Sequence, residues 1–136
     1  MAKARKINYI FAVGRRRSST ARIRLFHGKA ENTVNGMSAG KYFPGDIAAK
    51  IMAKPFGATE TSEKYYYSAK VTGGGKEGQL DAVVLGISRA LAKASPDKYR
   101  SSLKKLGLLT RDSRERQRRM VGKGGKARRA KQSPKR

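Results

Sequence analysis

The sequence contains no cysteine and no tryptophan, one histidine, and only nine acidic residues among its 136. Without cysteine the chain can form no disulfide, no thiolate zinc site and no thiol nucleophile, which excludes several classes of enzyme. No apolar run approaches the roughly 18 residues of a membrane span, and the basic start, Met1 to Lys6, leads into no apolar signal region. We therefore expect a soluble, non-secreted protein with no membrane partner.

Positive charge is what the sequence has in excess. Thirty-three Lys and Arg stand against the nine acids, so the formal net charge is +24 and the pI is about 11.1. A chain with this charge repels itself unless a polyanion neutralises it, and a phosphate backbone is the simplest such partner. The length suits a single domain.

Alternation of apolar and polar residues predicts strands in the first third of the chain. One strand is expected over residues 7–13, ended by Gly14. Its more apolar face carries the odd-numbered residues Ile7, Tyr9, Phe11 and Val13. A second strand over 20–25 has a core face and a face that displays Arg22 and Arg24. A short third strand through Thr33 and Val34 ends in an Asn35-Gly36 turn.

The middle of the chain predicts a helix and a further strand. Mixed three- and four-residue spacing over 38–54 predicts a helix that Pro44 starts and Pro55 stops. Residues 64–72 alternate again, so Tyr65 and Tyr67 are core candidates and Tyr66 is a candidate to stack on RNA bases.

Two helices complete the folded part. Apolar residues from about 79 to 94 form one helical stripe, and a shorter helix over 97–106 is capped by Gly107. Strands followed by helices predict an α+β domain over 1–109, with helices on one face of the sheet. Beyond it the apolar pattern vanishes, and from 111 to 136 there are twelve Lys or Arg and two acids. We expect an extended basic tail over 110–136 that is disordered alone, orders along phosphates, and forms a short helix over 114–120 on binding.

The glycine-rich loop Gly73 to Gly78 matches the GxGxxG spacing of dinucleotide-binding sites. The context is wrong, because that fingerprint requires a second parallel strand after the helix, and here another helix follows. Backbone amides before a helix, with Lys76 beside them, are instead predicted to contact an RNA phosphate. His27 has no ligand or nucleophile pattern around it, and the acids form no catalytic or metal-binding pattern. We expect no catalytic residue, metal, cofactor or small-molecule substrate.

The run Arg15-Arg16-Arg17 lies in a region, 14–24, that contains no acid. A solubilising surface mixes both signs of charge, so a region of one sign favours phosphate binding. Arginine suits that role because its guanidinium makes bidentate contacts with phosphate and stacks on bases.

Three blocks of the sequence resemble the bacterial type of the small-subunit ribosomal protein nine family. The first is GRRRSSTAR at 14–22, and the last is LTRD at 109–112. The internal block combines Gly73-Gly74-Gly75, Gly78-Gln79, Ala82, Gly86 and the run SRAL at 88–91. The likeness covers nearly the whole chain.

The resemblance implies a structural protein of the small ribosomal subunit that acts in translation. It implies binding of ribosomal RNA in the subunit head, beside other head proteins, and a tail whose final Lys135 and Arg136 contact peptidyl-site transfer RNA. It also implies a four-stranded mixed sheet with a left-handed βαβ crossover, as in the second domain of small-subunit ribosomal protein five. The ribosome would be cytoplasmic, with an organellar one left open. Ser133 and Pro134 depart from the family's usual aromatic-containing ending.

The residues predicted to contact ribosomal RNA are those of the basic run, the glycine loop, the helix after it and the tail. They are Arg15, Arg16, Arg17, Arg22, Gly73, Gly74, Gly75, Lys76, Gln79, Arg89, Arg111, Arg114, Arg118, Arg119, Lys123, Lys126, Arg128, Arg129 and Lys131. Charge alone equally supports a DNA-condensing protein, and the glycine loop leaves a nucleotide-dependent enzyme as a weaker alternative.

Overall fold

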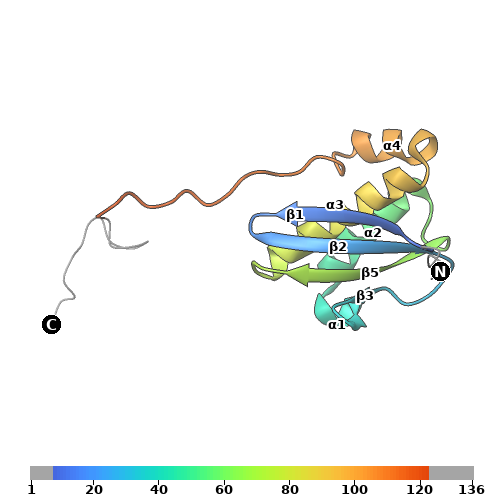
Figure 1. Ribbon diagram of the computed structural model, residues 1–136, viewed down its shortest axis with the longest axis horizontal. Coiled ribbons are helices and arrows are strands. Elements are labelled where there is room, and N and C mark those ends of the chain that lie inside the picture. The colour runs from blue at the N-terminus through green and yellow to red at the C-terminus, as the bar shows by residue number, and fades with distance from the viewer. Residues whose placement is uncertain (1–7, 123–136) are drawn as a thin grey trace, which may run out of the picture.

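The computed structural model describes residues 8–122; residues 1–7 and 123–136 lie outside the described part (Figure 1). One mixed sheet has the strand order β1-β2-β5-β3-β4. Of the strand pairs in the described part, β3–β5 is parallel and the others are antiparallel. The elements in chain order are β1 (Ile10–Arg16), β2 (Ser19–His27), β3 (Thr33–Val34), β4 (Met37–Ser38), α1 (Ala39–Tyr42), α2 (Asp46–Thr59), β5 (Tyr65–Thr72), α3 (Lys76–Ala94) and α4 (Pro96–Lys105).

The predicted α+β class is confirmed, and the predicted strand count is wrong. The sheet has five strands because the chain pairs again directly after the Asn35-Gly36 turn, as β4. At two residues β4 is too short to show alternation. The neighbouring β3 is also short, but Asn32 and Asn35 extend its pairing: the Asn32 Oδ1 accepts from the Tyr67 N–H at 3.1 Å, and the Asn35 Oδ1 accepts from the Val71 N–H at 2.8 Å.

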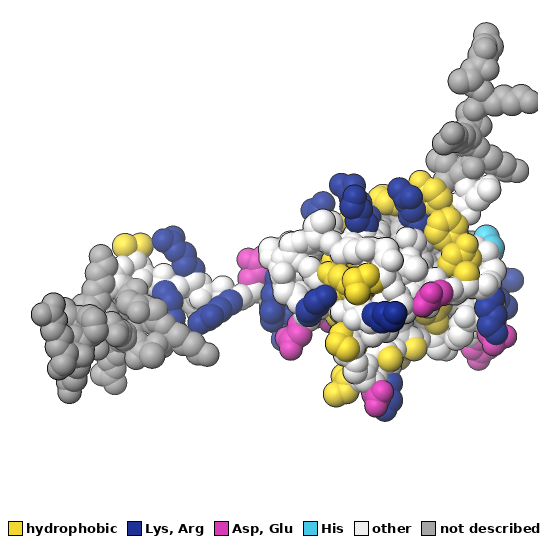
Figure 2. All heavy atoms as spheres, turned by 90° about the horizontal axis from the view of Figure 1, so that it is seen from below, with side chains coloured by type: hydrophobic (Ala, Val, Ile, Leu, Met, Phe, Trp, Pro, Cys, Tyr) yellow, Lys and Arg dark blue, Asp and Glu magenta, His cyan; other side chains and the backbone are white. Residues whose placement is uncertain are grey.

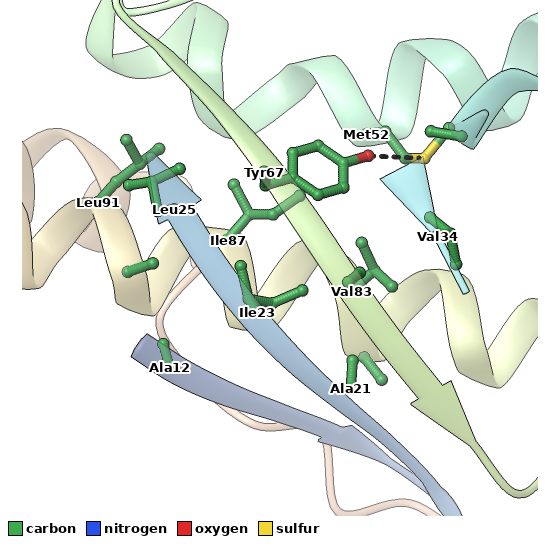
Figure 3. Packing of buried hydrophobic residues seen from close by; sticks show 14 of the residues in the cluster. Ala12, Ala21, Ile23, Leu25, Val34, Met52, Tyr67, Val83, Ile87 and Leu91 are labelled. Carbon is green, nitrogen blue, oxygen red and sulfur yellow. Dashed lines mark hydrogen bonds between the residues drawn. The ribbon is translucent and has the colours of Figure 1, made fainter. Parts of the chain in front are cut away.

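The core lies between the sheet and the helices on one of its faces, mainly α3 and α2 (Figures 1 and 3). Alternate residues of β2 and β5 point into it, so Ile23, Leu25 and Tyr67 are almost completely buried. The Tyr67 hydroxyl lies 3.5 Å from the Met52 sulfur of α2 (Figure 3). The predictions that Tyr65 and Tyr67 belong to the core are confirmed, and Tyr66 is partly exposed on the other face.

Strand β1 differs from its prediction in both extent and face. It continues through Gly14 to Arg16, and its core face carries Ala12 and Gly14, whereas Phe11 is 45% exposed. The reason is the close approach of α3: a Cβ on Gly14 would collide with the backbone of Ala82 and Gly86. Small residues are therefore required on the side that hydrophobicity alone assigned to the surface.

Residues 38–54 contain two helices, one on either side of Pro44. Helix α2 begins at Asp46, close to the start predicted at Pro44, but Pro55 does not stop it. Proline inside a helix removes an amide donor and crowds the carbonyl four residues earlier. Here Pro55 is fully buried beside Phe56, and this packing carries the helix one more turn. It ends at Glu60, whose φ is +54°, with the Thr61 N–H donating to the Phe56 carbonyl at 3.0 Å.

The other elements lie close to their predicted ranges. Helix α3 begins at Lys76 rather than Gln79, so the loop before it shortens to Gly73–Gly75. Helix α4 is followed by Gly107 with a φ of +69°, as a capping glycine requires. None of the helices in the described part is long and apolar enough to span a membrane.

Candidate nucleic-acid interface

The turn between β1 and β2 and the glycine loop pack together at one end of the sheet. The Ser19 hydroxyl donates to the Gly73 carbonyl at 3.2 Å. Both Gly73 and Gly74 have positive φ, and a Cβ on Gly73 would lie 2.5 Å from the Ser18 carbonyl oxygen. Glycine is therefore needed here both for backbone conformation and for contact with the turn. This end of the sheet presents the exposed side chains of Arg15 and Arg17.

Lys76 and Gln79, at the start of α3, hold the glycine loop against α1. The Lys76 Nζ donates to the Tyr42 carbonyl at 3.2 Å and lies 3.4 Å from the centre of the Tyr42 ring. The Gln79 side chain donates to the Gly73 carbonyl at 2.9 Å and accepts from the Tyr42 hydroxyl at 2.8 Å. Both side chains thus have structural contacts, and their predicted contact with RNA stays a prediction.

Arg16 is the buried member of the arginine run, with 11% of its side chain exposed. Its guanidinium lies 3.5 Å from the carboxylates of Asp81 on α3 and Asp112 in the tail. It also donates to the Arg114 carbonyl at 2.5 Å. One arginine of the sheet therefore fastens the root of the tail to the domain.

Asp112 takes part in the same attachment of the tail to the domain. Its carboxylate accepts hydrogen bonds from the Arg114 guanidinium at 2.7 and 3.0 Å and from the Arg114 N–H at 3.0 Å. These bonds, chiefly those of the Arg114 side chain, and the nearby Arg16 hold the pKa of Asp112 well below its usual range. Beyond it residues 113–120 form no helix or strand and run away from the domain (Figure 1).

Arg89 of α3 protects the outer edge of the sheet, because no strand of the described residues pairs with that side of β1. Its Nη1 donates to the Val13 carbonyl at 2.9 Å, and the Lys93 Nζ donates to the Phe11 carbonyl at 2.9 Å. Covering an edge in this way blocks pairing with another chain. The role of Arg89 in RNA binding likewise stays a prediction.

The remaining predicted contacts divide between the sheet and the tail. Arg22 is exposed on the face of the sheet away from the helices. Arg111, Arg118 and Arg119 are exposed in the tail, and dark-blue side chains line this part of it in Figure 2. The predictions outside the described residues are Lys123, Lys126, Arg128, Arg129, Lys131, Lys135 and Arg136.

Alternation in the sequence missed part of the exposed sheet face. Phe11 was assigned to the more apolar face of β1, and Lys70 received no role, yet both lie with Arg22 and Arg24 along one groove. The sequence signal for the buried face of β1 was the pair of small residues, Ala12 and Gly14, between the larger apolar ones, because only a closely packed helix requires them.

Residues 8–122 contain no group of three or more His, Asp or Glu side chains that could hold a metal ion, and no strand follows β5 between residues 73 and 122. His27 is exposed at the end of β2, 4.7 Å between ring centres from Tyr65.

The sequence is similar to those of known proteins. A family model described as ribosomal protein S9/S16 matches residues 14–136. The small ribosomal subunit protein uS9 of Thermus thermophilus is 44% identical over 126 residues, covering 93% of this chain and 97% of that protein.

Proposed function

The chain belongs to the ribosomal protein S9/S16 family, and from that premise we propose that it binds ribosomal RNA in the head of the small subunit and reaches peptidyl-site transfer RNA with the end of its tail. The predicted resemblance to the bacterial protein nine family is confirmed. As a member the chain is a non-enzymatic, structural protein of the small ribosomal subunit, and so part of the ribosome in the cytoplasm. Membership of this family excludes the alternatives of a DNA-condensing protein and of an enzyme.

The different surroundings of adjacent arginines support the proposed RNA contact most strongly. Arg16 fastens the tail, whereas Arg15 and Arg17 on either side of it are exposed and form no ion pair with any described residue. All nine acids of the sequence lie within residues 8–122, and none lies within the turn between β1 and β2. Two unneutralised guanidinium groups at the tip of a rigid hairpin suit a phosphate backbone.

The contacts of Arg16 also determine where the tail begins on the domain. Because Arg16 and Asp112 fasten the tail at the hairpin end, the cations of the tail start beside Arg15. A single RNA surface can then engage the hairpin and the tail together, which raises the effective concentration of the second contact. The proposed transfer RNA contact of Lys135 and Arg136, and a left-handed β3–α2–β5 crossover, rest on the family resemblance.

Replacing Arg15 and Arg17 by alanine tests the hairpin contact. We expect weaker incorporation into reconstituted small subunits and a slope of log K against log salt that is shallower by about 0.7 to 0.9 for each phosphate that the variant no longer binds. The matched control replaces Lys50 and Lys54, which are exposed on α2 and also remove two charges. Equal effects of the two double variants would show that only net charge matters and would refute a hairpin site.

Replacing Lys135 and Arg136 by alanine tests the tip of the tail. We expect weaker binding of transfer RNA in the peptidyl site of reconstituted subunits, with unchanged incorporation of the protein. Replacing Gln132 and Ser133 instead provides the control. Transfer RNA binding that is unchanged in the first variant would remove the assignment.

A further inference from the structure

The face of the sheet away from the helices is open and carries side chains in rows across the strands. Pairing places Phe11 opposite Arg24, which lies opposite Ser68. The next row is Val13, Arg22 and Lys70. This face lies edge-on along the top of the domain in Figure 2, where dark-blue and yellow side chains protrude side by side.

Arg22 and Lys70 are two like charges in directly opposed positions of neighbouring antiparallel strands. Such pairs have Cβ atoms about 5 Å apart and destabilise a sheet when their charges are alike. Neither side chain forms an ion pair with a described residue, and no acid occupies a strand position on this face. An anion bound between Arg22 and Lys70 would reduce this repulsion, so the arrangement favours anion binding on this face.

Phe11 adds an exposed aromatic ring to the same groove. The groove has a volume of about 710 Å³, and Phe11, Arg22, Arg24 and Lys70 are among its lining residues. Tyr9, Phe26 and Tyr66 contact one another: Phe26 stacks on Tyr66 with ring centres 5.1 Å apart, and its ring centre lies 5.7 Å from that of Tyr9. Arg24 lies over the Tyr9 ring. Among the described residues Phe11 has no aromatic partner and is 45% exposed.

We propose that this groove binds an unpaired stretch of RNA, with a base stacked on Phe11 and the adjoining phosphates held by Arg22 and Lys70. Aromatic rings beside cations are the recurring arrangement for single-stranded nucleic acid, because every base has a face that stacks. A duplex buries those base faces and would engage only the cations. The proposal deepens the RNA-binding function proposed above and rests on it.

An acidic peptide is the competing occupant, and the ring argues against it. Carboxylates would satisfy Arg22 and Lys70 equally well, but they leave Phe11 without a partner. Stacking therefore separates the two occupants, and stacking does not depend on salt as phosphate contacts do.

The experiment uses the full-length protein and two fluorescent probes, an oligoadenylate of about 12 nucleotides and an RNA duplex with the same number of phosphates. Anisotropy at about 0.5 M salt weakens the tail's electrostatic contribution. We expect Phe11→Ala to lower affinity for the oligoadenylate about tenfold and to leave the duplex unchanged, while Phe11→Tyr retains both. Ile47→Ala removes an apolar side chain that is 76% exposed on α2 and is the matched control.

Replacing Arg22 and Lys70 by glutamine should weaken both probes and lower the salt slope for the oligoadenylate by about 1.4, unlike the same change at Lys50 and Lys54. The proposal is overturned if Phe11→Ala matches Ile47→Ala, or if polyglutamate displaces the oligoadenylate equally from wild type and Phe11→Ala. Either result leaves the hairpin site standing if Arg15 and Arg17 still support incorporation. Failure of the wild-type protein to sediment with small subunits would instead refute the proposed function.

Discussion

Replacing Gly14 by alanine should strongly destabilise the domain, because Gly14 is where β1 and α3 come closest. A Cβ at this position would lie less than 3.0 Å from the Ala82 carbonyl oxygen and the Gly86 nitrogen. Both are backbone atoms, so no side-chain rotation relieves the collision. The helix and the strand must separate instead.

The magnitude follows from what that separation disturbs. Helix α3 supplies Val83, Ile87 and Leu91 to the centre of the core, and all three are fully buried. Overpacking a rigid core costs about 1–3 kcal/mol, and a collision with backbone lies at the upper end of that range. We therefore expect the free energy of unfolding to fall by about 3 kcal/mol, out of the roughly 5–15 kcal/mol typical of a domain.

Urea unfolding followed by circular dichroism measures this decrease. Gly75→Ala is the matched control, since Gly75 has a φ of −106° and an added Cβ there meets nothing within 4 Å. It should change the unfolding free energy by less than about 0.5 kcal/mol. If Gly14→Ala is as mild as Gly75→Ala, the close packing of α3 on β1 is wrong, and with it the reason for the exposure of Phe11.

Three further predictions concern the tail root and the core. Arg16→Met should lower the unfolding free energy by about 1–2 kcal/mol, since the carboxylates that pair with Arg16 are partly exposed, and should speed trypsin cleavage after Arg111; an unchanged cleavage rate would contradict the anchor. The Asp112 carboxyl should titrate by NMR below its ordinary pKa of 3.8, and Arg114→Gln should raise that midpoint; its stabilisation is present above the unfolded pKa and is lost as pH falls through the lower folded value. Burial raises the pKa of Tyr67 to about 12, so the contribution of its neutral hydroxyl to the free energy of unfolding is complete below pH 10 and is lost as pH rises toward 12. In Tyr67→Phe the free energy of unfolding should therefore fall less steeply over that interval.

Alternation predicted β5 and much of β2 correctly because each has one buried and one exposed face, so hydrophobicity and burial agree residue by residue. Alternation failed for β1 because the short distance between α3 and β1 decides which side chains fit on its buried face. A helix that approaches closely excludes Phe11 and Val13 from the facing side and leaves Ala12 and Gly14 in their place. Pro55 is a similar case: local propensity ends the helix, and burial of Phe56 with Pro55 against the core continues it.

The same distinction decides how far the candidate interface could be predicted. In the sequence Arg15, Arg16 and Arg17 are three equal charges, and from such counts composition predicts a protein that binds a polyanion, while the comparisons show that the chain belongs to a ribosomal protein family. Their roles separate only when a strand places alternate residues on opposite faces, which turns Arg16 inward to two carboxylates contributed by α3 and the tail. Pairing that joins residues far apart in sequence likewise creates the Arg22–Lys70 juxtaposition. A cationic side chain is free to bind a phosphate only where the fold brings no carboxylate close to it. Which side chains are free therefore depends on pairs of residues, and a count of charges cannot show it.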